Sequence, residues 1–338
     1  MKKVFILMFA AVLAAVSCAQ VDVVTPEKNP IETGVGLVSV SLKYAVPVSK
    51  AIDDYDFVLS EESQVYDVEV LVFDEETGRL ERSLSLDSVT DECVMELPIG
   101  RKVVYALVNG PDVSRIRNLE EFLQISDSLE DRDYMEDGFV MLGNSVCEVK
   151  KDVVAKPEVL VGRMVSRVVL RSVRCNIARQ YESLSVDCVF LGNANIDQSI
   201  GGNSSHMVNI DGYQDVAKEF PIGLDGKVGA CQQYLYRRVG SALSVGQIYD
   251  QPVCMYCQPN ESQDYTCLYM LVTIDGEQYY YRAELDKGLR PNASCAIDAV
   301  ITNVGSALPP DGLVQKGELE VVISIDDWAM GYLYNAEF

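Results

Sequence analysis

The stretch Val65-Tyr-Asp-Val-Glu-Val-Leu-Val-Phe73 gives the clearest indication of the fold. Four of its apolar side chains lie at alternate positions and so on one face, at Tyr66, Val68, Val70 and Val72. Alternation with a period of two is typical of a β-strand and does not fit a helix, whose period is about 3.6 residues. The acidic, glycine-containing sequence 74–78 follows and predicts a turn into a second strand at residues 79–86.

Similar strands are expected on both sides of this stretch. Upstream, apolar residues alternate with polar ones and predict a first strand at residues 37–44, with Val38, Val40, Leu42 and Tyr44 on one face. Downstream, residues 93–97 and 101–108 predict a hairpin around Pro98-Ile-Gly100. Further strands are expected at 139–142, 184–191, 233–239, 267–274, 278–284, 295–301 and 318–325, and the segment 193–229 is expected to be mainly loop.

One helix is expected after Asn118, which can cap it. Leu119, Phe122, Leu123 and Leu129 recur there at helical spacing. Residues 162–174 are ambiguous, because their arginines follow a helical spacing while their valines favour a strand. The β-branched residues decide for a strand, and a domain change is expected near residues 156–162.

The expected fold class is mostly β, with two β-sandwiches in tandem. A chain of 338 residues has room for two domains, and 48% apolar residues are enough for two cores. Many short strands separated by turn signals are typical of sandwiches. The predicted domains are residues 37–160 and 161–338.

The N-terminus predicts export and lipid attachment. Lys2 and Lys3 precede an uncharged apolar stretch that is too short for a membrane span, which needs about 20 residues. This pattern is typical of a signal peptide, here residues 1–17. The sequence Ala15-Val-Ser-Cys18 is similar to a lipoprotein cleavage site, in which Cys18 becomes the acylated first residue. The alternative is an ordinary secretory signal. Residues 18–36 then read as a tether.

Charge excludes several classes of partner. The formal net charge of −23 would repel nucleic acid phosphates and anionic membranes. Basic residues are concentrated at Arg163, Arg167, Arg171, Arg174 and Arg179. We expect them to form a solvated face that offsets nearby acids.

No catalytic, metal or cofactor site is expected. With Cys18 acylated, nine of the ten cysteines remain, and the spacing Cys254-Met-Tyr-Cys257 lacks the further ligands that zinc needs, so structural cysteines, paired or buried, are expected. The single histidine, His206, lies in a polar run and makes a Ser-His-Asp triad improbable. Asp326-Asp327 lies at a strand end and resembles a chance pair in a chain with 51 acidic residues.

Order and spacing together resemble one family. The segments concerned are Cys18, Leu37-Val-Ser-Val-Ser-Leu-Lys43, Lys50, Val65–Phe73, Val104-Tyr-Ala-Leu-Val-Asn109, Gly138-Phe-Val-Met141, 163–173 and 318–325 with Trp328. In these the chain is similar to the fimbrillins, the lipoprotein-precursor pilus subunits of Bacteroidales. The resemblance implies two tandem transthyretin-like β-sandwiches with one or two short helices.

The resemblance also implies a mechanism. The precursor reaches the outer membrane through a palmitate-type lipid on Cys18, and a trypsin-like protease cuts after the first strand. Here the cut would separate Lys50 from Ala51 and remove the propeptide 18–50. A strand from another subunit would then fill the groove left by Val38, Val40, Leu42 and Tyr44, giving a fimbrium on the cell surface. Its partners would be other fimbrial subunits, the processing protease and a host or bacterial surface receptor.

Three alternatives remain open at the level of sequence. Well-known fimbrillins carry Arg where this chain has Lys50, so the chain can instead be an uncut subunit that keeps its lipid and anchors the fibre. A surface glycan-binding lipoprotein is a second alternative, for which Tyr279-Tyr-Tyr281 is the visible aromatic cluster, although alternate burial along a strand explains it. A secreted hydrolase based on carboxylates is the third.

Overall fold

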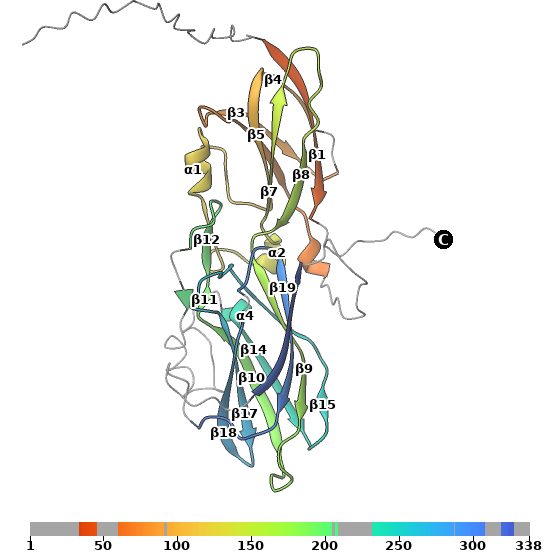
Figure 1. Ribbon diagram of the computed structural model, residues 1–338, viewed down its shortest axis with the longest axis vertical. Coiled ribbons are helices and arrows are strands. Elements are labelled where there is room, and N and C mark those ends of the chain that lie inside the picture. The colour runs from red at the N-terminus through yellow and green to blue at the C-terminus, as the bar shows by residue number, and fades with distance from the viewer. Residues whose placement is uncertain are drawn as a thin grey trace, which may run out of the picture. The chain divides into compact units, whose positions relative to one another are not determined.

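The computed structural model describes residues 34–45, 60–90, 93–204, 207–208, 232–286, 288–307 and 319–327. The predicted signal peptide and the predicted residues Cys18, Lys50, Ala51 and His206 lie outside these ranges. The described chain is built almost entirely from β-strands, so the mostly β prediction is confirmed (Figure 1). Its helices are short, and within these ranges no helix is long and apolar enough to cross a bilayer.

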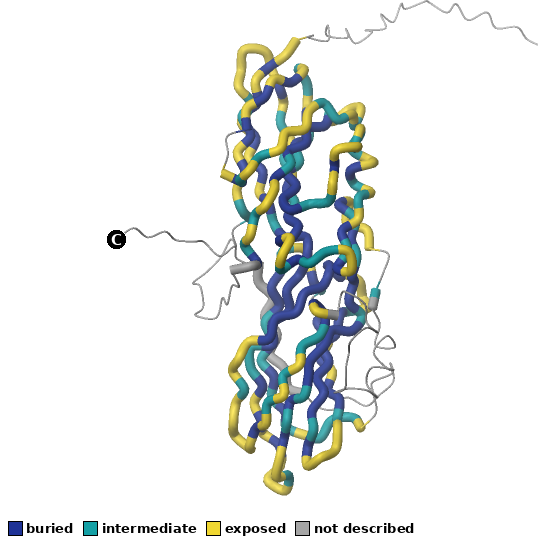
Figure 2. Tube along the Cα trace, turned by 180° about the vertical axis from the view of Figure 1, so that it is seen from behind, coloured by how far each residue is buried: buried dark blue, intermediate teal, exposed yellow. Residues whose placement is uncertain are grey.

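The first half of the chain forms a seven-stranded sheet in the order β3-β2-β5-β7-β8-β1-β4. Its strands are β1 (Val35–Tyr44), β2 (Val68–Asp74), β3 (Leu80–Leu86), β4 (Cys93–Pro98), β5 (Gly100–Val108), β7 (Met141–Val149) and β8 (Glu158–Arg163). The sheet curls around a core to which nearly all of these strands contribute, so that side chains of β1 and β2 lie in one cluster. Figure 2 shows this core as dark blue segments inside the upper part of the chain.

β2, which forms most of the stretch quoted at the start, has buried residues on both faces. Val68, Val70 and Val72 of β2 pack into the core of the seven-stranded sheet. Leu71 and Phe73, on the opposite face, belong to a second core shared with the later half of the chain. The strand begins only at Val68, and Tyr66, which the alternation placed with the valines, is 55% exposed.

The second half of the chain forms two sheets around the second core. One has the order β14-β10-β17-β18 and the other β15-β9-β19-β20, with β16 also pairing with β9. The strands are β9 (Ser166–Cys175), β10 (Leu184–Gly192), β14 (Tyr236–Leu243), β15 (Ile248–Tyr249), β16 (Val253–Cys257), β17 (Cys267–Ile274), β18 (Glu277–Glu284), β19 (Ala293–Ile301) and β20 (Leu319–Asp327). Figure 1 shows the sheets as the lower group of ribbons.

Short elements lie between the long strands of the two halves. They are η1 (Ser60–Ser63), α1 (Leu119–Leu123), β6 (Ser126–Ser128), α2 (Tyr134–Asp137), β11 (Ala194–Asn195), β12 (Asp197–Ser199), β13 (Met207–Val208) and α4 (Gln232–Leu235). β6 pairs with β12, and β11 pairs with β13. Part of the segment 193–229 is therefore strand rather than loop.

The ambiguous stretch 162–174 is strand, as predicted, but it is interrupted. β8 ends at Arg163 and β9 begins at Ser166, so the chain leaves the first sheet and enters the later one at Met164 and Val165. The predicted domain boundary between residues 160 and 161 falls inside β8, which pairs with β1 and β7 of the first sheet.

Three local predictions are correct only in part. Asn118 does cap α1, but the helix ends at Leu123 and Leu129 lies beyond it, since β6 is drawn into pairing with β12. β4 and β5 are not a paired hairpin, because β2 and β7 occupy both edges of β5. The strand expected at 233–239 begins as α4, which buries Tyr234 and Leu235.

Candidate functional site

The first strand lies between two others and is the natural candidate for exchange. The first half of β1 pairs antiparallel with β4, from Val35 opposite Pro98 to Val40 opposite Cys93. The second half pairs parallel with β8, from Ser41 opposite Glu158 to Tyr44 opposite Val161. On the β8 side the ladder continues upstream, since Ser39 N–H donates to the Ala155 carbonyl over 2.9 Å. β4 has no other ladder partner among the described strands, so removing β1 would leave it unpaired.

The inward face of β1 is apolar and closely packed. Val38, Val40 and Leu42 are 0%, 2% and 8% exposed in the core of the first sheet, and Tyr44 packs against it half-buried. The outward residues include Leu37, which is 43% exposed, and Lys43, which pairs with Glu158 at the surface. Burying one large aliphatic side chain stabilises by about 1.5–3 kcal/mol, so β1 is held firmly by its three buried aliphatic residues and its hydrogen bonds.

Gly36 is a fourth buried inward position that the alternation of apolar residues did not indicate. A Cβ at this position would lie 2.4 Å from the Lys150 carbonyl oxygen and 2.8 Å from Val149 Cγ1. Neither neighbour can move cheaply, because one is backbone and the other is part of a buried valine. The site therefore disfavours any side chain larger than that of glycine where the strand enters the groove.

Gly36→Val is expected to lower the free energy of unfolding by about 1–3 kcal/mol, as overpacking of a core position does. Ser41→Val is the matched control, because Ser41 points outward on the same strand and is exposed. Urea unfolding of the two variants of the full chain measures the difference. Equal effects of the two substitutions would contradict the packing described for Gly36.

Both ends of the segment that contains Lys50 are fixed. Before it, Ala45 N–H donates to the Val161 carbonyl over 2.8 Å, at the end of β8. After it, Glu62 in η1 is fully buried, with 0% exposure. A cut between these two points would separate β1 from a body that begins at a buried anchor.

Glu62 is held by side chains from three strands. Arg167 Nη1 of β9 donates to Glu62 Oε2 over 2.9 Å, and Tyr256 OH of β16 donates to Oε1 over 2.7 Å. Arg163 of β8 donates to the main-chain carbonyl of Glu62 from Nε and Nη2, over 3.0 and 2.8 Å. We call Glu62, Arg163, Arg167 and Tyr256 the Glu62 cluster.

The prediction of a solvated basic face holds for Arg174 and Arg179, which are exposed, but is wrong for the two arginines of this cluster. Arg163 and Arg167 are 0% and 2% exposed, and Arg167 also donates from Nε to Ser294 Oγ over 3.0 Å. Burial lowers the pKa of Arg163 to about 10, which leaves it charged at neutral pH. Burial and the carboxylate of Glu62 raise the pKa of the Tyr256 hydroxyl, which therefore remains a donor. Two charges buried together need such hydrogen bonds to offset their desolvation.

The Glu62 cluster lies next to the C-terminal end of β1, the strand that is the candidate for exchange. Burial raises the pKa of Tyr44, and the positive charge of Arg163 acts on it in the opposite direction. Sequence reasoning selected Val38, Val40, Leu42 and Tyr44, and the structure places all four on the inward face of β1. The sequence alone did not indicate Gly36 or Glu62. A glycine in phase with the alternating residues was an available signal, whereas Glu62 sits in an acidic run and had none.

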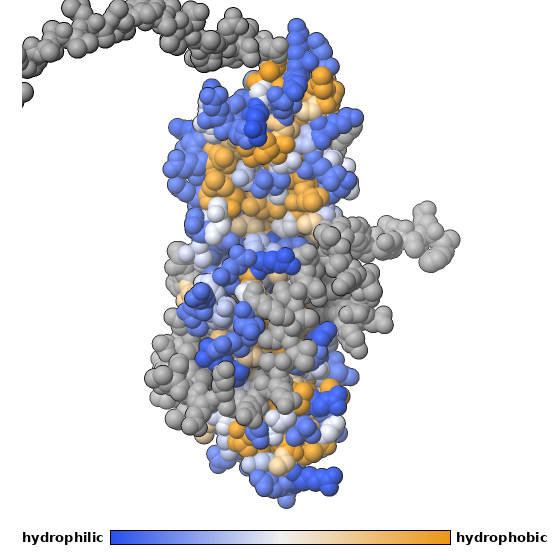
Figure 3. Space-filling model, in the orientation of Figure 1, coloured by the Kyte–Doolittle hydropathy of each residue, from blue (hydrophilic) through white to orange (hydrophobic). Residues whose placement is uncertain are grey.

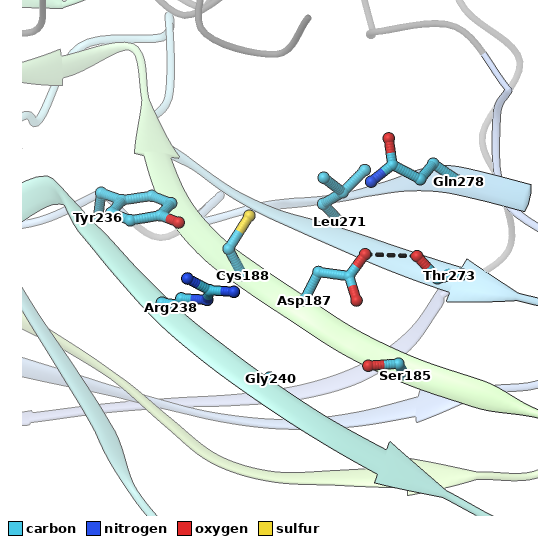
Figure 4. Close-up of a pocket in the computed structure, with 9 residues that line it drawn as sticks. All are labelled: Ser185, Asp187, Cys188, Tyr236, Arg238, Gly240, Leu271, Thr273 and Gln278. Carbon is cyan, nitrogen blue, oxygen red and sulfur yellow. Dashed lines mark hydrogen bonds between the residues drawn. The ribbon is translucent and has the colours of Figure 1, made fainter. Parts of the chain in front are cut away.

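A separate hollow of 310 Å³ lies on the outer face of the β14-β10-β17-β18 sheet (Figure 4). Asp187 accepts a hydrogen bond from Thr273 Oγ1 over 2.5 Å. Burial raises the pKa of the Cys188 thiol, which keeps it protonated and unreactive. Among the nine residues that line the hollow, Asp187 is the one carboxylate and Tyr236 the one aromatic side chain. The hollow thus offers neither a carboxylate pair for glycoside hydrolysis nor an aromatic platform for a sugar.

The cysteines and the tyrosine run are parts of the core. Cys254 and Cys257 lie in the fully buried strand β16, and burial raises their thiol pKa values to about 11 and about 12. The described cysteines form no disulfide with one another, and all except Cys147 are buried. In the described ranges no three His, Cys, Asp or Glu side chains are grouped as metal ligands. Tyr280 and Tyr281 are adjacent and both buried, so burial does not alternate along this tyrosine run as expected.

Solved structures match most of the chain, although no protein-family model and no curated protein matches the sequence. A candidate cell adhesion protein from Bacteroides eggerthii superposes with a TM-score of 0.61 at 13% identity, covering 87% of this chain and 96% of that one. One from Parabacteroides distasonis has a TM-score of 0.60 at 14% identity, covering 88% and 98%. A fimbrilin from Porphyromonas gingivalis has a TM-score of 0.58 at 16% identity, covering 88% and 99%.

The chain has the fold of the fimbrilins. The resemblance predicted from the order of sequence segments is confirmed at this level, and the match extends over both halves of the chain. The similar structures are named for adhesion and fimbriae rather than for catalysis.

Proposed function

We propose that the protein is a fimbrial subunit that polymerises when a strand of a neighbouring subunit replaces its first strand, and that it contributes to adhesion at the cell surface. It is exported as a lipoprotein precursor acylated on Cys18 and cut between Lys50 and Ala51. The observation that carries the proposal is the position of β1, which fills a groove between β4 and β8 while the rest of the body is held by other strands.

The groove specifies what must replace β1. An incoming strand has to run antiparallel to β4 and parallel to β8, in the same direction as β1 itself. It has to offer a small residue at the Gly36 position and aliphatic residues at the next three inward positions. Main-chain hydrogen bonds supply affinity in such additions, and the pockets for alternate side chains supply selectivity.

Surface composition around the groove is consistent with contact between subunits. Apolar side chains that are at least 43% exposed lie on β1, on β4, on β7, on β8 and in the segment between β7 and β8, namely Val35, Leu37, Val94, Val146, Leu160, Val153 and Val154. Figure 3 shows orange apolar surface over the upper sheet among blue polar residues. Exposed apolar patches commonly mark interaction sites.

Complementation of the emptied groove tests the proposal. A recognition site for a specific protease replaces the sequence around Lys50 in the full chain, and the released segment is removed in mild denaturant. Hydrogen exchange at residues 93–98 and 155–161 is expected to rise, because these backbones lose β1. A peptide of residues 34–45 should restore protection and keep the protein monomeric.

Two altered peptides sharpen this test. Replacing Val38 and Val40 by Asp should abolish rescue, since each charge would enter the core. Replacing the outward Leu37 and Ser41 by Asp should leave rescue largely intact. If the inward and outward variants rescue equally, or if the emptied protein stays monomeric and protected without any peptide, the strand-exchange proposal is wrong.

A further inference from the structure

The joint between β6 and β12 contains a buried polar cluster that strand exchange does not use. Asp127 of β6 lies directly opposite Gln198 of β12, and Gln258 follows β16. The three side chains are 1%, 8% and 0% exposed. Asp127 belongs to the excursion between β5 and β7, whereas the two glutamines belong to the second half of the chain, so the cluster connects the halves.

These three residues direct acceptor oxygens into the buried region without matching donors. Asp127 Oδ2 accepts hydrogen bonds from the Tyr134 hydroxyl and, over 3.1 Å, from Gln258 Nε2. Asp127 Oδ1, Gln198 Oε1 and Gln258 Oε1 are buried and have no hydrogen-bond partner in the described structure. Directly opposed residues of an antiparallel pair have Cβ atoms about 4.5–5.5 Å apart, which brings Gln198 within reach of the carboxylate.

The carboxylate also lacks a counter-ion. Within the described residues Asp127 forms no salt bridge, and Arg132 instead donates to the Asn109 carbonyl and lies 5.8 Å from the centre of the Tyr134 ring. An isolated buried carboxylate is costly, so a proton or a cation is required.

We propose that Asp127, Gln198 and Gln258 bind a hard cation through their side-chain oxygens. Carboxylate and amide oxygens are the ligands that Ca²⁺ and Na⁺ favour, whereas soft metals prefer thiolate and imidazole. One cation satisfies all three acceptors and the charge together. A proton on Asp127 Oδ1 could serve only one amide oxygen and would leave the other without a partner. Gln198, the least buried ligand, marks the side from which the cation enters.

The site would tie the excursion that carries α1, β6 and α2 to the second half of the chain. Its loss would loosen the pairing of β6 with β12, including the hydrogen bond from Leu129 N–H to the Ile196 carbonyl of 2.8 Å. This effect is independent of the groove, because none of the ligands touches β1.

Cation binding can be measured on the full chain after dialysis against a chelator. Tb³⁺ is the spectroscopic probe, because Tyr134 donates to Asp127 and can transfer excitation to a lanthanide at the site. We expect saturable luminescence that Ca²⁺ competes away, together with a rise of several degrees in Tm on adding Ca²⁺. A parallel titration with NaCl at constant ionic strength distinguishes a Na⁺ site, for which Na⁺ rather than Ca²⁺ raises Tm.

Three variants make the outcome decisive. Asp127→Asn should lose at least tenfold in affinity, and Gln198→Ala should also weaken binding if Asp127→Asn fails to fold. Asp131→Asn removes an exposed carboxylate nearby and should change nothing. The proposal is overturned if Tb³⁺, Ca²⁺ and Na⁺ all leave Tm unchanged, or if Asp127→Asn and Gln198→Ala bind like the unaltered protein. A Tm that responds to pH through Asp127 but to no cation would assign a proton instead and would equally overturn it.

Discussion

Arg167→Met is expected to lower the free energy of unfolding by about 3–5 kcal/mol, the usual cost of removing one partner from a buried ion pair. Glu62 would stay at 0% exposure without the Arg167 donor to its Oε2, while the Tyr256 hydroxyl still donates to Oε1. Because Glu62 fixes the chain just after the Lys50 segment, the loss should also loosen η1. Urea unfolding followed by circular dichroism measures the first effect, and hydrogen exchange at residues 60–67 measures the second.

Arg171→Met is the matched control on the same strand. Arg171 pairs with Asp298, but the two side chains are 25% and 35% exposed. Partly exposed pairs contribute about 0–1 kcal/mol, so this variant should be nearly as stable as the unaltered protein. If both methionine variants lose the same small amount, Glu62 is not the anchor described above.

Lys50→Ala is expected to have the largest effect on assembly, because it removes the residue after which the proposed cut is made. The uncut chain keeps β1 in its groove, held by three buried aliphatic side chains and ladders to β4 and β8. Spontaneous release against such contacts is rare, so the variant should remain monomeric and absent from fibres. Incorporation is measured by immunoblotting fibres sheared from cells that produce the variant.

Lys28→Ala is the control for this experiment. Lys28 precedes β1, so a cut there would leave the strand attached, and its loss should not affect incorporation. Normal incorporation of Lys50→Ala at the fibre base would instead favour the lipid-retaining anchor. Fully processed protein that neither multimerises nor joins a fibre would contradict the subunit proposal as a whole.

The sequence predicted the elements whose residues alternate simply. In β1, polar and apolar residues alternate, and the strand accordingly has one buried face. The position of β2 was predicted correctly, but only one of its two buried faces was. Leu71 and Phe73 face a second core that alternation cannot reveal. Pairing was harder still, because the strands at 93–98 and 100–108 are adjacent in sequence yet belong to different ladders.

The candidate site was predicted only in its apolar part. Arginines on a strand are exposed in most proteins, so the sequence favoured a solvated face for Arg163 and Arg167. Their burial depends on Glu62, which is separated from them by about a hundred residues and sits among other acids. Such a pair becomes visible only when the fold brings η1 against the ends of β8 and β9.

The most direct test of the central claim is the N-terminal residue of the subunit in fibres. Mass spectrometry of protein sheared from the cell surface and purified as polymer identifies it. The proposed exchange predicts chains that begin at Ala51 and lack residues 18–50, so that β1 is gone and its groove is open to a neighbour. Chains in the polymer that begin at an acylated Cys18 and retain β1 would contradict it.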